Sequence, residues 1–373
     1  MSTLFFYGTL RFAPLLELVL GRPAAEIDLT PAKLVDHAVH AVQDQAFPMI
    51  LESPGQQADG LLVRGLNAED IARLEYYEGG FDYDLATRTL TLPDGSRAEA
   101  EVFFPEPGLW QPGEPWSLEA WAEAWGELTL IAAEEVMSFY GRVDAQRIAR
   151  SFPAIRMRAW ARIAARSRAR GNTRDVARDV IVHRRHHAYV DYFGLDEVEL
   201  QHRQHDGSMG PVLNRNALTN GQAAVVLPYD PVRDTVLLIE QFRAPVYMIG
   251  DPDPWTWEAV AGMIDPGESP ETTAFREAVE EAHVELQRLE FAGGAYSSCG
   301  SSTEYVHLFV GLGDLTGTVT NGGVDGEGED IRSHILPFEE FMQWVDGNRI
   351  KSLQLLTLAH WLARHRDRLR GQA

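Results

Sequence analysis

Residues 261–284 read AGMIDPGESPETTAFREAVEEAHV, and this stretch decides the fold of the C-terminal half of the chain. It carries three carboxylates, Glu277, Glu280 and Glu281, at spacing i, i+3 and i+4. On an α-helix that spacing puts the three side chains on one face, where they repel each other. A divalent cation such as Mg²⁺ removes the repulsion and also binds substrate phosphates. The alternative is a solvated helix face, which is the commoner outcome for an isolated triplet.

The loop and the helix start ahead of the triplet have signals of their own. Gly262 allows a tight loop. Ser269 is expected to cap the helix, with Pro270 in its first turn. Glu268 and Arg276 are expected to pair and to hold the loop against the helix, which is a structural role.

The spacing G-x5-E-x7-R-E, followed by x-x-E-E, resembles the Nudix box. This box is the signature of the Nudix hydrolases, which cleave nucleoside diphosphates linked to another moiety. One position departs from it, because the usual Gly near the box end is His283 here. That Gly ends the helix in a left-handed conformation. We therefore expect His283 to add strain or to shift the helix end, without removing a metal ligand.

The resemblance extends beyond the box. Three segments resemble bacterial ADP-ribose pyrophosphatases: GQAAVVLPYDPVRDTVLLIEQFRAPVY (221–247), WTWEAVAGMIDPGESPETTAFREAVEEA (255–282) and GEGEDIRSHIL (326–336). This resemblance implies an α/β/α sandwich that hydrolyses ADP-ribose to AMP and ribose 5-phosphate. Another nucleoside diphosphate sugar or a dinucleotide is the alternative substrate. The related enzymes are homodimers, so a homodimer formed through this domain is implied as well.

The resemblance also implies a metal site on the box helix. Glu277 and Glu281 are the best predicted ligands, Glu280 supports them, and the Ala261 carbonyl is implied as a further ligand by the family. The predicted metal is Mg²⁺, with Mn²⁺ as the alternative. Such ions clamp a pyrophosphate and lower the pKa of a bound water. Glu281 therefore counts among the predicted catalytic residues.

The predicted catalytic base comes from a different segment. In this subfamily the base lies in a loop after the sheet, which matches residues 326–331 here. Glu327 and Glu329 are the two candidates in that loop. We favour Glu329, because it directly precedes the Asp330-Ile331 segment in which the strand resumes. A Gly-rich acidic loop that orders when substrate binds is compatible with this role.

Three further side chains are predicted to contact the substrate. Arg243 is the best phosphate or ribose contact, because a guanidinium binds two oxygens at once; the alternative is a surface ion pair with Glu240. Glu258 and Glu304 match acidic positions near the family's substrate pocket. Trp255 and Trp257 are expected either to stack on adenine or to pack in the core, and we favour packing in the core.

The N-terminal hundred residues carry a second set of motifs. Tyr7, Gly8, Thr9 and Leu10 follow a first strand, and LEYYEGGFDY places Glu78 before two glycines. This pairing resembles the gamma-glutamylcyclotransferase-like (AIG2-like) fold, a small barrel. In that family the YGTL loop offers backbone groups to a gamma-glutamyl substrate. The matched carboxylate takes a proton from the α-amine, which attacks its own γ-carbonyl and releases 5-oxoproline.

A structural role for Glu78 is the competing interpretation. The carboxyl is then buried and held by hydroxyls of the neighbouring tyrosines. The domain would in that case bind a ligand or act as a scaffold without catalysing cyclotransfer. Loss of 5-oxoproline production in Glu78→Ala distinguishes the two.

The sequence divides into three parts. Residues 1–108 alternate short strands with turns and one short helix near 70–77, which predicts an α+β domain. Residues 109–174 follow a Pro- and Gly-rich stretch and form a helical linker. Residues 175–373 alternate strands and helices, which predicts an α/β domain.

The predicted linker helices start at Ser117 and run again over residues 144–168, with an interruption at Pro153. The first has an apolar stripe, and the second is rich in arginine. An arginine-rich helix could touch a membrane or nucleic acid. We favour a bridging helix whose arginines face solvent or the acidic domains.

Composition limits the remaining alternatives. The formal net charge of −22 argues against nucleic-acid or anionic-membrane partners and leaves a small-molecule substrate. The single cysteine, Cys299, excludes an internal disulfide framework and suits a reducing cytoplasm. It is expected to be buried or inert. The start MSTLFFYGTL has no basic region and does not resemble a signal peptide.

Overall fold

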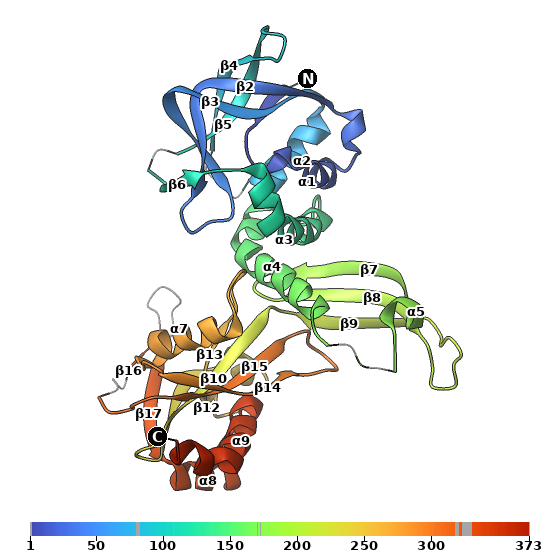
Figure 1. Cartoon of the computed structure of the whole chain (residues 1–373). Helices are drawn as coiled ribbons and strands as arrows, with labels where there is room; N and C mark the ends of the chain where they lie inside the picture. The colour runs from blue at the N-terminus through green and yellow to red at the C-terminus, as the bar shows by residue number, and fades with distance from the viewer. Residues whose placement is uncertain are drawn as a thin grey trace. The chain divides into compact units, whose positions relative to one another are not determined.

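The computed structural model describes residues 2–79, 83–106, 108–169, 171, 173–317, 321–322 and 330–372 (Figure 1). The chain forms two compact units. The first comprises Met1–Ala159 and Arg185–Gly194, and the second comprises Trp160–Arg184 and Leu195–Ala373. The division of the sequence at 108 and 174 stays a prediction.

The first unit is built on a closed barrel, as the sequence predicts. Its strands run in the order β3-β1-β5-β4-β2, and pairing of β2 with β3 closes the ring, while β6 extends β2. The strand bounds are β1 Ser2–Phe6, β2 Asp28–Val42, β3 Pro48–Leu66, β4 Tyr83–Thr91, β5 Arg97–Pro105 and β6 Pro112–Pro115. Small barrels fill their interior with side chains, and Phe5, Leu62 and Val102 are fully buried in this one.

Two α-helices and two short 3₁₀ segments accompany the barrel. They are η1 Thr9–Arg11, α1 Ala13–Leu20, η2 Ala24–Glu26 and α2 Ala68–Glu78. Helix α2 is the short helix predicted near 70–77, and Asn67 caps it in a reciprocal capping box with Asp70. The prediction of one helix was incomplete. Helix α1 was missed because APLLELVL is apolar almost throughout and lacks a clear helical period.

Helices α3 (Leu118–Ser138) and α4 (Ala145–Arg166) follow the barrel. Helix α3 begins directly after Ser117, where the sequence predicts a helix start, and the Ser117 hydroxyl caps it by accepting from the Ala120 N–H at 3.3 Å. Helix α4 runs through Pro153, so the predicted interruption was wrong. The expectation that its arginines face solvent or acidic surfaces was wrong for Arg158. That guanidinium is 2% exposed and donates twice to one oxygen of Glu135, at 2.6 and 3.0 Å.

A short helix and a three-stranded sheet come next along the chain. Their bounds are α5 Val176–Asp179, β7 Val180–Val190, β8 Gly194–His202 and β9 Leu213–Thr219. The strands pair in the order β7-β8-β9. Strands and a helix thus alternate here, as the sequence predicts for residues 175–373.

The second unit contains an eight-stranded sheet with the path β14-β15-β10-β11-β17-β16, to which β12 and β13 add on β11 and β10. The strand bounds are β10 Gln222–Asp230, β11 Thr235–Phe242, β12 Trp255–Glu258, β13 Val260–Met263, β14 Arg288–Tyr296, β15 Tyr305–Leu312, β16 Asn321–Gly322 and β17 Ile331–Pro337. The helices are α6 Ala244–Met248, α7 Pro270–Ala282, α8 Phe338–Asp346 and α9 Leu353–Arg370.

Helices cover both faces of this sheet, which confirms the predicted α/β/α sandwich. Successive residues of β10 point to opposite faces. Val226 packs in one cluster with Ala278 of α7, whereas Leu227 packs in another with Phe341 of α8 and Leu358 of α9. Figure 1 shows α7 on one side of the sheet and α8 and α9 on the other.

No helix within the described ranges is long and apolar enough to span a membrane.

Candidate functional site

The start and the end of α7 follow the sequence signals. The Ser269 hydroxyl accepts from the Thr272 N–H at 3.1 Å, and Pro270 is the first helical residue. The helix ends at Ala282, and His283 follows with φ 52° and ψ 39°. Of the two expectations for this position, strain is the one observed, because His283 adopts the left-handed conformation that a glycine tolerates best.

Gly262 brings the backbone of β13 against the box helix. A Cβ built on Gly262 would lie 1.8 Å from Oε1 of Glu277. The residue is part of a strand and pairs with Ala224. The prediction that Gly262 forms a tight loop was therefore wrong. Glycine is required here because the Glu277 carboxylate approaches the backbone closely, and not because the chain makes an unusual turn.

Arg276 makes more contacts than predicted. It pairs with Glu268 at 3.2 Å, as expected, and it also donates to Glu277 at 2.7 Å and Glu280 at 2.9 Å. Burial lowers the pKa of Arg276, but the hydrogen bonds and charges of these three carboxylates outweigh burial and raise the pKa above its ordinary value. The guanidinium thus balances part of the negative charge on this helix face.

Glu281 lies deepest of the three carboxylates. Its side chain is 3% exposed, and one oxygen accepts from the Ala261 backbone N–H at 3.0 Å. Two predicted ligand positions, Ala261 and Glu281, are therefore in direct contact. The structure brings Glu277 and Glu281 to the same strand, β13, which the one-dimensional spacing did not show.

The donor chemistry of this region fits a hard divalent cation. Carboxylate and carbonyl oxygens are the ligands that Mg²⁺ and Mn²⁺ prefer, and Gly262 leaves the room that the Glu277 carboxylate occupies. Within the described ranges, no three Asp, Glu, His or Cys side chains are gathered around one point. Arg276 lies between Glu277 and Glu280 instead.

The two candidate bases lie outside the described residues. Glu327 and Glu329 both belong to the segment that the structure does not describe, so their role as the base stays a prediction. The neighbouring expectation is confirmed, because β17 begins at Ile331, directly after Asp330.

The structure places Arg243 directly before α6, facing Glu258. The guanidinium donates to both carboxylate oxygens, with distances of 2.8 and 2.9 Å. Glu240, the alternative partner, pairs with Arg332 at 2.8 Å instead. The surface ion pair Arg243–Glu240 was therefore a wrong interpretation. Arg243 and Glu258, predicted separately as substrate contacts, form one unit.

The remaining predicted contacts have distinct surroundings. Glu304 accepts from the Asn220 side-chain amide at 3.3 Å. Trp257 is 8% exposed and belongs to the core, as favoured, whereas Trp255 is 55% exposed and packs edge-on against Phe242. Cys299 is exposed, so of the two expectations for this thiol the buried one was wrong, and an inert thiol stays a prediction.

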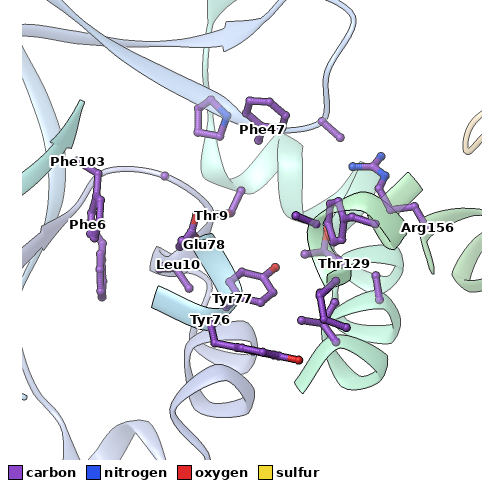
Figure 2. A pocket seen from close by; sticks show the side chains of 18 of the residues that line it. Phe6, Thr9, Leu10, Phe47, Tyr76, Tyr77, Glu78, Phe103, Thr129 and Arg156 are labelled. Carbon is purple, nitrogen blue, oxygen red and sulfur yellow. The ribbon is translucent and has the colours of Figure 1, made fainter. Parts of the chain in front are cut away.

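A pocket of about 260 Å³ in the first unit joins the two N-terminal motifs. Tyr7, Gly8, Thr9 and Leu10 line it together with Glu78. Figure 2 shows Glu78 beside Thr9 and Leu10, with Tyr77 next to it. The structure thus brings together segments about seventy positions apart, which the sequence paired only through family resemblance.

The electrostatics of this pocket differ from those of α7. Burial raises the pKa of Glu78 to about 7. Burial, and then the charge of Glu78, raise the pKa of Tyr7 above its ordinary value. Among the described residues, Tyr7, Tyr76 and Tyr77 donate no hydrogen bond to Glu78, and the Tyr76 hydroxyl itself is buried without a partner. The carboxyl is therefore not held in place by these hydroxyls.

Part of the pocket wall was not predicted. Residues of α3 and α4 line it, among them Thr129, Val136, Ile148 and Arg156. The apolar stripe of α3 was visible in the sequence, but a stripe alone does not distinguish a core contact from a cavity wall. Arg156 was counted with the other linker arginines, and no sequence signal separated it from them.

Comparisons with known proteins match the two halves separately. The family model of the NUDIX domain matches residues 219–356, and that of gamma-glutamyl cyclotransferase, AIG2-like, matches residues 4–123.

Similar curated proteins match over about half of the chain. An ADP-ribose pyrophosphatase of Escherichia coli (strain K12) is 38% identical over 194 residues, which are 52% of this chain and 92% of the relative. An ADP-ribose pyrophosphatase of Haemophilus influenzae is 33% identical over 176 residues, 47% of this chain and 81% of the relative. A GDP-mannose pyrophosphatase of Yersinia enterocolitica is 35% identical over 151 residues, 40% of this chain and 78% of the relative.

Proposed function

Because the chain belongs to the Nudix hydrolases and carries an AIG2-like gamma-glutamyl cyclotransferase domain, we propose that it hydrolyses the pyrophosphate of ADP-ribose. The products are AMP and ribose 5-phosphate. Hydrolysis of a nucleoside diphosphate sugar is the activity common to the relatives. Among nucleoside diphosphate sugars we favour ADP-ribose, because the relative that this chain covers to 92% of its length is named an ADP-ribose pyrophosphatase.

The observation that carries this proposal is the packing of α7 on β13. Glu281 is buried against the Ala261 N–H, and Glu277 occupies the space that a side chain at Gly262 would fill. A buried carboxylate needs compensation by a cation or by hydrogen bonds. Glu277 and Glu281, with Glu280 and the Ala261 carbonyl in support, would hold Mg²⁺ or Mn²⁺. Such a cation supplies charge neutralisation for the two phosphates.

The other residues bind and orient the substrate. Arg243 offers a planar guanidinium to phosphate or ribose oxygens, and Glu258 fixes its orientation through two hydrogen bonds. Glu304 belongs to the same predicted site. Glu329, with Glu327 as the alternative, takes the proton from the attacking water. Proximity of these groups to the phosphates lowers the entropic part of the barrier.

A substrate comparison tests the proposal. The full chain is incubated with Mg²⁺ and, separately, ADP-ribose, GDP-mannose and NADH, and the nucleotides released are separated by chromatography. We expect AMP from ADP-ribose with a kcat/KM well above the values for the other two. A higher kcat/KM for GDP-mannose or NADH would contradict the substrate assignment while leaving pyrophosphate hydrolysis intact.

The N-terminal pocket supports a second activity, cyclotransfer of a gamma-glutamyl group. The specific observation is a carboxyl with a pKa of about 7 beside the Tyr7–Leu10 loop. A base with that pKa exchanges protons readily near neutral pH. In the reaction the α-amine nitrogen bonds to the γ-carbonyl carbon and gives its proton to Glu78. The γ-amide C–N bond then breaks, and the leaving amine takes up that proton.

Production of 5-oxoproline from a gamma-glutamyl amide is the direct assay for this activity. Glu78→Gln should abolish it, whereas Glu75→Gln, an exposed carboxylate on the same helix, should not. Undiminished production in Glu78→Gln would contradict the assigned role. Absence of the product with the wild type would favour a binding or scaffolding domain.

The assembly belongs to the proposal as well. We place the domains at residues 1–108, 109–174 and 175–373, with a homodimer formed through the last of them. Sedimentation equilibrium of the full chain should give twice the mass of 41.7 kDa. A monomer at micromolar concentration would contradict it.

A further inference from the structure

A cavity of about 280 Å³ lies in the second unit, on the face of the sheet opposite α7. It is lined by residues of β12, β17, α8 and the segment after α8, namely Trp257, Arg332, Ser333, His334, Trp344 and Arg349. In β17, Leu336 packs with Phe341 of α8, whereas Ile331 packs with Ala278 of α7. Because successive strand residues point to opposite faces, Arg332 and His334 lie on the α8 face. The cavity is therefore separate from the predicted metal site.

Three rings packed on each other frame this cavity. The ring centroid of Trp257 lies 5.6 Å from that of His334 and 5.4 Å from that of Trp344. The rings of His334 and Trp344 are stacked, with centroids 5.8 Å apart and planes inclined by 10°. Such ring contacts stabilise one arrangement of the side chains beyond what burial alone contributes. The three rings thus give the cavity a defined aromatic wall.

Two guanidinium groups lie against this aromatic wall. The central carbons of the Arg332 and Arg349 guanidiniums are 5.3 and 6.0 Å from the centroid of the same Trp257 ring. The Arg349 carbon is also 3.5 Å from the centroid of the Trp344 ring. Cation–π attraction holds a guanidinium over an indole face. Both cations are therefore held beside one cavity.

The charges at this cavity are not balanced within the molecule. Arg332 pairs with Glu240 at 2.8 Å. In the part of the chain that the structure describes, no carboxylate pairs with Arg349, whose contacts are with the two tryptophan rings. The cavity therefore carries an excess of positive charge in a chain with a formal net charge of −22. Such a local field attracts an anion.

From this arrangement we infer that the cavity binds a phosphomonoester. A carboxylate takes one guanidinium on its two oxygens, as Glu258 does with Arg243. A phosphate dianion has a third oxygen and a second charge, so it can pair with both Arg332 and Arg349. A volume of about 280 Å³ lies near the lower end of the range for small-molecule sites, which leaves room for the group that carries the phosphate. The inference goes beyond the proposed hydrolysis, whose products, AMP and ribose 5-phosphate, are both phosphomonoesters.

Hydrogen–deuterium exchange with mass spectrometry can read this cavity separately from the catalytic face. The full chain with Mg²⁺ is titrated with AMP, ribose 5-phosphate, inorganic phosphate and adenosine. Peptides covering residues 332–334 and 344–349 report on the cavity, and peptides covering residues 261–281 report on the α7 face.

The four compounds separate the phosphate from the group that carries it. We expect AMP and ribose 5-phosphate to slow exchange in the cavity peptides. Adenosine and inorganic phosphate should do so only at concentrations about tenfold higher or more, because each lacks one part of the ligand. Equal affinity for adenosine would overturn anion recognition, and equal affinity for inorganic phosphate would overturn the assignment to a phosphomonoester.

Arg349→Gln links the protection to its cation. In this variant the dissociation constant read from the cavity peptides should rise by about 10- to 100-fold, the worth of a charged hydrogen bond. Arg364→Gln, which removes an exposed arginine of α9, should change it by less than about twofold. No change in Arg349→Gln would overturn the inference. An equal loss in Arg243→Gln would also overturn it, because the protection would then come from the predicted substrate site.

A second variant covers the case in which Arg349→Gln does not fold. Glu240→Gln removes the carboxylate that pairs with Arg332, and so leaves that guanidinium to the ligand. The dissociation constant for AMP at the cavity peptides should fall by about threefold, the worth of an exposed ion pair. Unchanged or weaker binding in Glu240→Gln would contradict the role of the two guanidiniums.

Turnover distinguishes failure of this inference from failure of the proposed hydrolysis. If ADP-ribose is not hydrolysed, but AMP protects the cavity peptides and Arg349→Gln removes the protection, the phosphomonoester site stands and the hydrolysis proposal falls. If ADP-ribose is hydrolysed and neither AMP nor ribose 5-phosphate protects these peptides, the inference is wrong and the hydrolysis proposal stands.

Discussion

The carboxylates of α7 and the carboxyl of Glu78 show how opposite surroundings prepare one chemical group for two tasks. Arg276 of α7 contacts Glu268 in the preceding loop and Glu277 and Glu280 on the helix itself, and its hydrogen bond helps to hold the pKa of Glu268 below its ordinary value against the effect of burial. In the N-terminal pocket, burial raises the pKa of Glu78 to about 7. Carboxylate oxygens suit a hard divalent cation, and a carboxyl that titrates near neutrality suits proton transfer.

The largest expected effect concerns Gly262. In Gly262→Ala the new Cβ would lie 1.8 Å from Oε1 of Glu277, so the carboxylate must leave its position. We expect kcat for ADP-ribose hydrolysis to fall by about 100-fold or more, as for loss of one electrostatic stabiliser. Gly300→Ala, where nothing lies within 4 Å, is the matched control. Full activity of Gly262→Ala would show that the position of Glu277 is not needed.

The pH profile of 5-oxoproline formation comes next. Glu78 accepts a proton only when ionised, and its pKa is about 7. The rate should therefore rise about tenfold per pH unit below 7 and level off above it. Rates measured from pH 5 to pH 9 with buffers of constant ionic strength give the midpoint. A midpoint near 4.5 would show that the pocket does not perturb this carboxyl.

Much of the α7 region could be predicted from sequence because its contacts are local. The Ser269 cap and the Glu268–Arg276 pair lie within one helix and its loop, so spacing was enough. The Glu135–Arg158 pair and the position of Arg156 in the pocket lining depend on how two helices pack, and no residue spacing encodes that. Gly262 was identified, but the close approach of Glu277 needed the paired strands.

The raised pKa of Glu78 should also make the free energy of unfolding of the first unit depend on pH. Because the folded-state pKa exceeds the ordinary value of 4.5, this group's contribution to stability is full below about pH 4.5 and is lost as pH rises through about 7. Glu78→Gln removes the cost of ionisation. At pH 8 it should raise the free energy of unfolding of the first unit by on the order of 1–3 kcal/mol, with no gain at pH 4.5. Thermal denaturation at both pH values, with Glu75→Gln as control, measures this.

The smallest expected effect is at the end of α7. His283 holds a left-handed conformation with φ 52°. His283→Gly should remove about 1 kcal/mol of strain and raise the unfolding midpoint by about 2–4 °C. Glu285→Gly, at an exposed position without positive φ, should lower the midpoint instead. A fall in both variants would show that His283 makes contacts worth more than its strain.

The most direct test of two separate carboxylate sites is a crossed assay on the full chain. Glu281→Gln and Glu78→Gln are each measured for AMP release from ADP-ribose and for 5-oxoproline release from a gamma-glutamyl amide. We expect Glu281→Gln to lose AMP release by about 100-fold or more and to keep 5-oxoproline release, and Glu78→Gln to show the reverse. Loss of AMP release in Glu78→Gln, or its survival in Glu281→Gln, would contradict the account.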